Sequence, residues 1–340
     1  LVEGAGELVP LPGGHARDEA AATLDLIYHD AKAYAVGHGC AADWHLEGAE
    51  RVVVATHFPM YEVPSMTPEL RRADGTLLEV SMRDLADPAT ARNGGGGLRD
   101  VVIEYERWLD AREAELQTFE GRERTAAERH LAAGREALAR MRRGLDLLAE
   151  DPLVSEAFSL MNEAMLLQQL ASKAKPRRYR KGDGKAAAGF EPAFRSPSVV
   201  DVPEGLGRWR PFQVGFLLTA LDSVADKGSG ERDLVDLIWF PTGGGKTEAY
   251  LGLVAFSALL RRLRDPNDAG TDTLMRYTLR LLTAQQFQRA ASLVCALEVL
   301  RRRRPEALGH APFGIGLWVG GANSPNRWQD AIKALSRLGR

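Results

Sequence analysis

The spacing of apolar residues divides the chain into regions of different character. From residue 98 to 175, alanine, leucine, glutamate and arginine recur with few prolines, and their spacing predicts amphipathic helices. Gly121, Gly134 and the Asp151-Pro152 step are the expected breaks between these helices. This region is therefore predicted to be a helical hairpin or a small bundle.

Residues 1–97 mix both kinds of periodicity. Helical spacing predicts a helix over 23–35, and runs of apolar residues predict strands over 51–56 and 76–80. Four consecutive glycines follow Asn93, and we interpret this run as a flexible linker. The first part of the chain is therefore predicted to be an N-terminal α+β region.

Residues 176–204 are predicted to be a basic, flexible linker. Lysine and arginine crowd the stretch 173–185 together with proline, glycine and alanine. Clustered positive charge attracts the phosphate backbone of a nucleic acid, but it also keeps an exposed loop soluble. The sequence leaves these two interpretations open.

From residue 205 to 340, strand-like and helical runs alternate. The predicted strands are 234–240, 273–277 and 314–319, and the predicted helices are 245–264, 282–303 and 327–338. Such alternation predicts an α/β domain with a parallel sheet and right-handed crossovers. Because only three strands are identifiable, we expect this domain to be incomplete.

Composition limits the class of protein. The chain has 340 residues, of which 45% are hydrophobic and 26% charged, with a formal net charge of -2, as is typical of globular domains. Cys40 and Cys295 lie far apart and predict free thiols in a reducing cytoplasm. No run approaches the ~18 apolar residues of a membrane span, so we expect no membrane association. The chain begins at Leu1 without an initiator methionine, and we expect its true start to lie upstream.

The most specific motif is Pro-Thr-Gly-Gly-Gly-Lys-Thr at 241–247, between the predicted strand 234–240 and a predicted helix. Glycines let backbone N–H groups turn inward around phosphate oxygens, and the helix N-terminus adds partial positive charge. The predicted nucleotide contacts in this loop are Thr242, Gly243, Gly244, Gly245, Lys246 and Thr247. The general pattern begins with glycine, whereas this chain has Phe240 there. A glycine-rich surface turn is the competing interpretation.

Lys246 and Thr247 are the candidate catalytic residues of the loop. Lys246 is expected to reach the β- and γ-phosphates of ATP, and the Thr247 hydroxyl is expected to ligate Mg²⁺. Upstream, Gln213 is a candidate reader of adenine, because an amide pairs with both the N6 donor and the N7 acceptor. Phe212 or Trp209 is a candidate apolar wall for the base. The alternative for Gln213 is that it caps a helix.

Downstream, Arg280, Thr283 and Gln285 lie at a predicted strand-to-helix turn. Loops outside the carboxyl ends of parallel strands form binding sites, so these residues are candidate contacts to the phosphates or bases of a DNA strand. A capped helix with Arg280 in a structural ion pair is the alternative. Gly320 and Gly321 offer close backbone approach at another strand end, with a plain turn as the competing interpretation.

Together these elements resemble the superfamily 2 helicases and translocases. Residues 210–213 (RPFQ) resemble the adenine-reading Q element, 241–247 motif I, 278–285 (TLRLLTAQ) motif Ia, and 320–321 the double-glycine motif. The leading Pro-Thr of motif Ia is replaced here. The resemblance implies that 205–340 is an incomplete RecA-like domain, the first of the two helicase domains. It also implies ATP and Mg²⁺ as cofactors and DNA, single-stranded or duplex with an overhang, as partner.

Three longer strings resemble the helicase-like component of the bacterial DISARM anti-phage defence system. They are YAVGHGCAADW at 34–44, DLIWFPTGGGKTEAYL at 236–251 and MRYTLRLLTAQQFQRA at 275–290. This resemblance implies an ATP-dependent, DNA-acting protein of anti-phage defence. It further implies a protein partner that carries a DUF1998 domain.

Two parts of a hydrolytic site are not found in the sequence. One is an Asp-Glu-x-His/Asp box after a strand, and the other is a second RecA-like domain with an arginine finger. We therefore expect this chain to bind nucleotide without hydrolysing it alone, as the N-terminal portion of a longer enzyme. Two other functions remain open: a nucleotide-gated scaffold that docks a protein partner without moving along DNA, and a P-loop kinase of small substrates.

Overall fold

The computed structural model describes most of the chain. The described residues are 11, 18–47, 50–56, 67–173, 177–180, 189–193, 199–200, 202–203, 205–240, 243–277, 280–318, 325 and 327–338. The helices are α1 (Glu19–Ile27), α2 (Met82–Leu85), α3 (Pro88–Arg92), α4 (Leu98–Glu115), α5 (Gly121–Glu150), α6 (Pro152–Lys173), α7 (Pro211–Ala225), α8 (Lys246–Arg264), α9 (Arg280–Arg303), α10 (Pro305–Leu308) and α11 (Trp328–Leu338), with a 3₁₀ turn at Leu116–Thr118. The strands are β1 (Ala41–Glu47), β2 (Glu50–Thr56), β3 (Val80–Ser81), β4 (Arg178–Arg180), β5 (Gly189–Glu191) and β6 (Arg208–Trp209).

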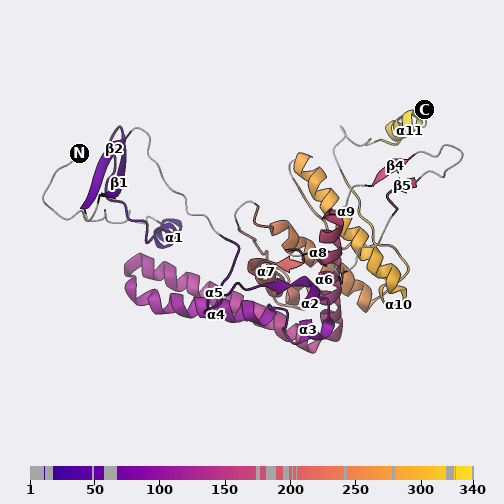
Figure 1. The fold of residues 1–340 in the computed structure, drawn as a ribbon, viewed down its shortest axis with the longest axis horizontal. Helices are drawn as coiled ribbons and strands as arrows, with labels where there is room; N and C mark the ends of the chain where they lie inside the picture. The colour runs from indigo at the N-terminus through magenta and orange to yellow at the C-terminus, as the bar shows by residue number, and fades with distance from the viewer. Residues whose placement is uncertain are drawn as a thin grey trace.

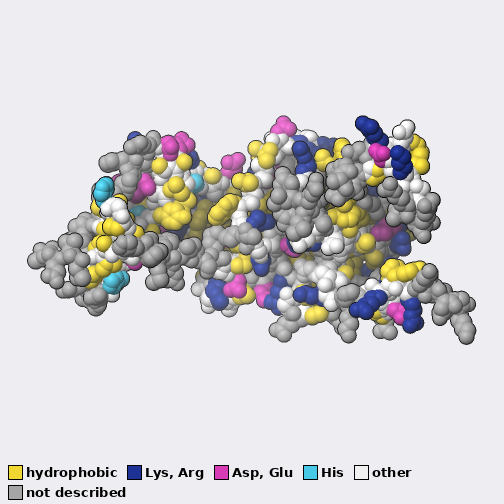
Figure 2. Space-filling model, turned by 90° about the horizontal axis from the view of Figure 1, so that it is seen from above, with side chains coloured by type: hydrophobic (Ala, Val, Ile, Leu, Met, Phe, Trp, Pro, Cys, Tyr) yellow, Lys and Arg dark blue, Asp and Glu magenta, His cyan; other side chains and the backbone are white. Residues whose placement is uncertain are grey.

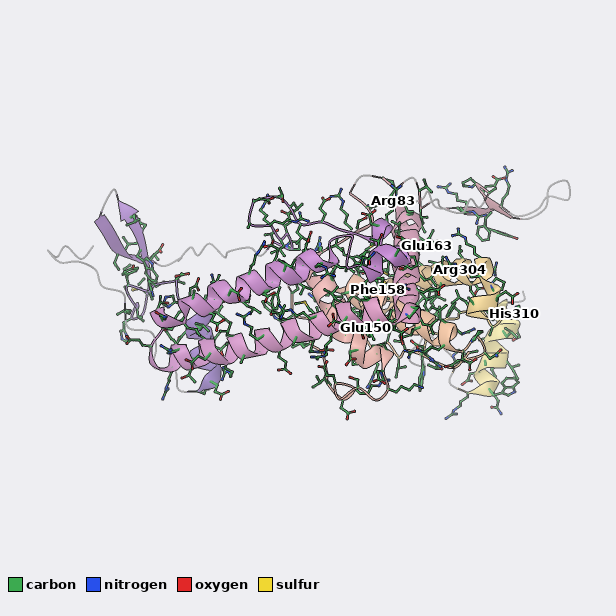
Figure 3. The ribbon with its side chains drawn as sticks, turned by 90° about the horizontal axis from the view of Figure 1, so that it is seen from below. Arg83, Glu150, Phe158, Glu163, Arg304 and His310 are labelled. Carbon is green, nitrogen blue, oxygen red and sulfur yellow. The ribbon has the colours of Figure 1, made fainter. Side chains whose placement is uncertain are left out.

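Helix α6 lies at the centre of the core (Figure 1). Its buried side chains lie on all sides of the helix, which is the pattern of an enclosed helix. Helices α2, α3, α5, α8 and α9 pack against it. Figure 3 labels Phe158 and Glu163 on α6, and Arg303 in the last turn of α9 donates a hydrogen bond to Glu163 at 3.0 Å. One buried apolar cluster runs from Leu78 to Leu308, so the predicted helical and nucleotide-binding regions share a core.

Local capping explains where the central helices begin. The Asp151 carboxylate accepts a hydrogen bond from the Leu153 N–H at 2.8 Å, and Pro152 takes the first helical position of α6. The predicted breaks at Asp151-Pro152 and at Gly121, the first residue of α5, are confirmed. The predicted break at Gly134 is wrong. This glycine lies inside α5, because one glycine costs a helix only about 1 kcal/mol and packing against α4 outweighs it.

Helices α4 and α5 form an antiparallel hairpin that extends away from the core (Figure 1). α5 also packs on α7, so closely that a Cβ on Gly144 would lie 2.3 Å from the Leu218 carbonyl oxygen. Arg140, about one turn earlier, donates two hydrogen bonds to Asp236 at 2.8 and 3.1 Å and one to Glu231 at 2.7 Å. Helix α5 thus holds both α7 and the segment that leads into the predicted phosphate loop.

The glycine run before α4 is a packed turn, so the predicted flexible linker is wrong. Gly94, Gly96 and Gly97 adopt φ values of 67°, 60° and 91°, a region that favours glycine. A Cβ on Gly97 would lie 2.5 Å from the carbonyl oxygen of Glu79. These glycines therefore provide a sharp turn and a close backbone approach.

The described strands form three two-stranded antiparallel sheets: β1 with β2, β3 with β6, and β4 with β5. The predicted strand 51–56 is confirmed as part of β2. The predicted strand 76–80 is reduced to one bridge between Arg71 and Leu77 and the two residues of β3. β4 and β5 form a short hairpin within the predicted linker 176–204. No helix in the described residues is long and apolar enough to cross a membrane.

The parallel sheet predicted for the last part of the chain is not seen among the described residues. Segments 234–240, 273–277 and 314–318 carry no strand there, although α8, α9 and α11 follow them as predicted. Parallel strands are stable when both neighbours pair and helices cover both faces. Here apolar side chains of the segments remain in solvent, with Val235 and Trp318 each 94% exposed. The described chain therefore mixes helices and short strands, and a RecA-like sheet stays a prediction.

Further apolar surface lies around these segments. A groove of about 980 Å³ lies between α8, α9 and the segments 268–277 and 312–318. On α11, Trp328, Ile332 and Leu335 recur at helical spacing and are all exposed. Figure 2 shows that apolar side chains also reach the surface elsewhere on the face it displays. Contiguous exposed apolar surface is typical of interaction sites and of ligand-binding grooves.

Candidate nucleotide-binding site

The predicted phosphate loop lies between the segment 234–240, which has no regular secondary structure, and helix α8. Gly243 and Gly245 have φ values of 85° and 87°, and Gly245 is the residue that caps α8 at its N-terminus. Residues with a side chain rarely adopt such positive φ values, so the backbone path of the loop requires glycine at both positions. A Cβ on Gly243 would meet no described atom within 4 Å. Open space therefore lies beside the loop, at the positive end of the α8 helix dipole.

The loop is tied to the N-terminus of α7 by two side chains. Arg210 donates through one guanidinium nitrogen to the carbonyl oxygens of Gly243, at 3.4 Å, and of Gly244. The Gln213 amide nitrogen donates to the Gly245 carbonyl oxygen at 2.7 Å. Its amide oxygen accepts from the Arg210 N–H, also at 2.7 Å, which caps α7. The loop shape is therefore fixed from outside by α7.

Gln213 is 3% exposed, and both polar ends of its amide bond the protein backbone. The capping role that the sequence left open is thus present in this structure. Phe212, one of the two candidate walls for the base, stacks on Phe240 with ring centroids 4.2 Å apart and an interplanar angle of 4°. The prediction for Trp209, the other candidate, is wrong, because its ring is 2% exposed and its indole N–H donates to Asn162 in the core. Phe240 replaces the first glycine of the general motif. Its ring has a packing role beside the loop.

Lys246 and Thr247 occupy the first turn of α8. The Lys246 ammonium donates to the carbonyl oxygen of Phe240, at the end of the segment that enters the loop. The Thr247 hydroxyl accepts a hydrogen bond from the Tyr250 hydroxyl at 3.1 Å. The Tyr250 oxygen lies 2.9 Å from the Tyr277 oxygen. Desolvation, and secondly this hydrogen bond with Tyr250, raise the pKa of Tyr277 above its usual value.

An ion pair links the first turn of α8 to α9. Arg289 donates to the Glu248 carboxylate, and burial lowers the pKa of this guanidinium. The Arg289 carbonyl oxygen accepts a hydrogen bond from the Gln168 amide of α6 at 3.0 Å. The phosphate loop, α9 and the central helix are therefore connected through charged and polar contacts as well as through packing.

The other predicted site residues fall into two groups. Gln285 lies on α9 with an exposed side chain, and Arg280 and Thr283 lie in the first turns of the same helix, with side chains outside the description. Thr242, Gly320 and Gly321 lie outside the described residues. The structure thus brings Gln213 and the residues from Gly243 to Thr247 together, and the predicted nucleic-acid contacts stay predictions.

Three residues at the site have no role in the sequence prediction: Arg210 as a loop tie, Tyr250 and Tyr277. Tyr250 had a detectable signal, because residues three apart share one face of a helix and Thr247 is already a candidate. Arg210 bonds the loop, and Tyr277 bonds Tyr250 on α8, from segments that are distant in sequence. Their roles depend on tertiary packing, which local spacing does not encode.

The site is defined by a glycine loop that enters a helix at Lys-Thr, which is the arrangement of a phosphate-binding loop. No protein-family model matches the chain. It is similar to the DISARM protein DrmA of Bacillus paralicheniformis, with 33% identity over 320 residues. That alignment covers 90% of this chain but 27% of the relative, so the chain spans about a quarter of its length. The similarity relates the chain to a DISARM protein.

Proposed function

We propose that this chain is the ATP-binding portion of an ATP-dependent DNA helicase or translocase that acts in anti-phage defence. The observation that carries the proposal is the loop itself: Gly243 and Gly245 in left-handed conformations, directly before Lys246 and Thr247 at the start of α8. The similarity to a DISARM protein supports the defence role. The motif I and motif Ia resemblances support the motor.

The residues present fit a nucleotide with its metal. The open space beside Gly243 suits phosphate oxygens, and the α8 N-terminus favours their negative charge. Lys246 carries a flexible ammonium at the start of α8, and this is the group that would reach the β- and γ-phosphates. The Thr247 hydroxyl is the candidate Mg²⁺ ligand, and the metal would neutralise charge that develops on the phosphates.

DNA and a partner with a DUF1998 domain complete the proposal. The observation that supports DNA binding is that the start of α9 lies near the predicted phosphate loop. Tyr277, three residues before Arg280, contacts Tyr250 on α8, the helix that follows this loop. A strand bound near the start of α9 would therefore lie close to the nucleotide. Arg280, Thr283 and Gln285 are the proposed contacts to its phosphates and bases, with Gly320 and Gly321.

The test is ATP hydrolysis by the full-length protein with and without single-stranded DNA. The motor predicts that DNA stimulates phosphate release, with a strong dependence on salt because phosphate contacts release counterions. A nucleotide-gated scaffold predicts stimulation by a protein partner and none by DNA. Hydrolysis that is insensitive to DNA at every salt concentration would therefore reject the motor.

A further inference from the structure

The hydroxyl of Thr247 is held by a chain of two tyrosines. The Tyr250 hydroxyl donates to Thr247 Oγ1 at 3.1 Å, and the oxygens of Tyr250 and Tyr277 lie 2.9 Å apart. A phenol carries one hydrogen. Because Tyr250 donates its one hydrogen to Thr247, Tyr277 must be the donor in the hydrogen bond between the two tyrosines. The order of donation is therefore Tyr277 to Tyr250 to Thr247.

This order decides what the Thr247 oxygen can offer a ligand. A hydroxyl oxygen has two acceptor positions and one hydrogen. Tyr250 occupies one acceptor position, which leaves the hydrogen and one lone pair to share the other two positions around the oxygen. The bond from Tyr250 thereby holds the Thr247 oxygen in place with one lone pair still available to a cation that requires strict octahedral geometry at short distance.

We propose that Tyr250 is a positioning residue for the nucleotide-bound Mg²⁺, and that Tyr277 sets Tyr250. The inference rests on the proposed function and deepens it, because it concerns the metal of the same site. Tyr250 acts through Thr247 and does not itself touch the metal. Because Tyr277 lies outside α8, the position of the Thr247 oxygen also depends on a second segment of the chain.

Two features of the structure suit this role. Tyr277 keeps the hydrogen that it donates at ordinary pH, because a tyrosine ionises only near a pH of about 10, and desolvation and the bond with Tyr250 raise its pKa further. Tyr277 also lies on the segment 273–277, which precedes α9 in the chain. A displacement of that segment would remove the donor to Tyr250 and loosen the hold of Tyr250 on the Thr247 hydroxyl. Metal affinity would then depend on the position of this segment.

The experiment measures binding of a fluorescent ATP analogue to the full-length protein over a series of Mg²⁺ concentrations, and in EDTA. Tyr250→Phe should raise the Mg²⁺ concentration at half-maximal binding about three- to tenfold, the effect of one lost hydrogen bond. Binding in EDTA should be unchanged. Tyr277→Phe should shift the same midpoint in the same direction by about two- to threefold, since the bond from Tyr250 to Thr247 remains. The double variant should equal Tyr250→Phe, because the two residues act in series.

Tyr105→Phe is the matched control. Tyr105 is a half-buried tyrosine on α4, stacked on Trp108, and its loss of a hydroxyl should leave the Mg²⁺ midpoint unchanged. An unchanged midpoint in Tyr250→Phe would overturn the inference. Equal weakening with Mg²⁺ and in EDTA would also overturn it, since that result assigns Tyr250 to the shape of the helix. Absence of binding by the wild type at every Mg²⁺ concentration would reject the proposed function, and the inference with it.

Discussion

Gln213→Met keeps the length of the side chain but removes both of its hydrogen bonds, one that caps α7 and one that ties the loop to α7. Gln213 is 3% exposed, and its amide joins the Arg210 N–H to the Gly245 carbonyl oxygen. A hydrogen bond of this kind contributes about 0.5–1.5 kcal/mol, so losing both should lower the free energy of unfolding by about 1–3 kcal/mol. Of the two, the bond to Gly245 is the one that holds the loop.

The same bond sets the expected loss of nucleotide affinity. If about 0.5–1.5 kcal/mol of loop ordering is lost, binding should weaken about two- to tenfold. Because the Gln213 amide bonds backbone atoms, ATP and GTP should lose affinity by the same factor. An adenine reader would behave differently, since its removal would weaken ATP and leave GTP almost unaffected.

Fluorescent ATP and GTP analogues titrated into wild type and variant distinguish these two roles, and urea denaturation gives the stability. Gln117→Met, an exposed glutamine in the 3₁₀ turn between α4 and α5, is the control and should change neither quantity. Selective loss of ATP binding would refute the loop-tie account of Gln213. So would wild-type affinity for both nucleotides.

Two further predictions concern the core and the acid stability of α9. Trp209→Phe leaves the buried Asn162 Oδ1 without its donor at 2.7 Å and should lower the free energy of unfolding by about 1–3 kcal/mol, measured by urea denaturation. The control Trp239→Phe, at a residue 76% exposed, should leave this free energy almost unchanged. Equal losses in the two variants would contradict the prediction. A hydrogen bond from Arg301, opposed in part by desolvation, lowers the pKa of Glu298 from 4.5 to about 2. Its stabilisation is therefore complete above pH 4.5 and disappears as the pH falls towards 2. Glu298→Gln should flatten that part of the acid-unfolding curve followed by circular dichroism, and an unchanged curve would refute the assignment.

Local patterns predicted the features that depend on local structure. The helices 245–264 and 327–338 agree with α8 and α11 to within a residue, because periodic apolar residues and capping signals define helix boundaries. The glycine loop that leads into α8 was also accessible to sequence analysis, because its glycines and the Lys-Thr pair are adjacent in the chain; its binding of phosphate stays a prediction. The Gln213 capping interaction has the same local origin.

Features that depend on tertiary contacts were not predictable in this way. The run Gly94–Gly97 resembles a flexible linker in composition, but it forms a turn whose glycines are required by the approach of Glu79. Arg210 holds carbonyls more than thirty positions away. The segment 234–240 has the apolar content of a buried strand, yet pairing requires neighbouring strands, and in the described residues Leu237 is 87% exposed.

The most direct test of the central claim is equilibrium binding of ATP with Mg²⁺ to the full-length protein, measured by calorimetry for wild type and Lys246→Ala. Hydrogen bonds that involve a charged group contribute about 1.5–3 kcal/mol, so the variant should bind at least about tenfold more weakly. Its urea midpoint should stay close to that of the wild type, because the Lys246 side chain bonds a loop carbonyl at a partly exposed position. Saturable binding by the wild type with this loss in the variant is the predicted result. Equal affinity in both proteins would contradict the assignment of this loop as the phosphate-binding site.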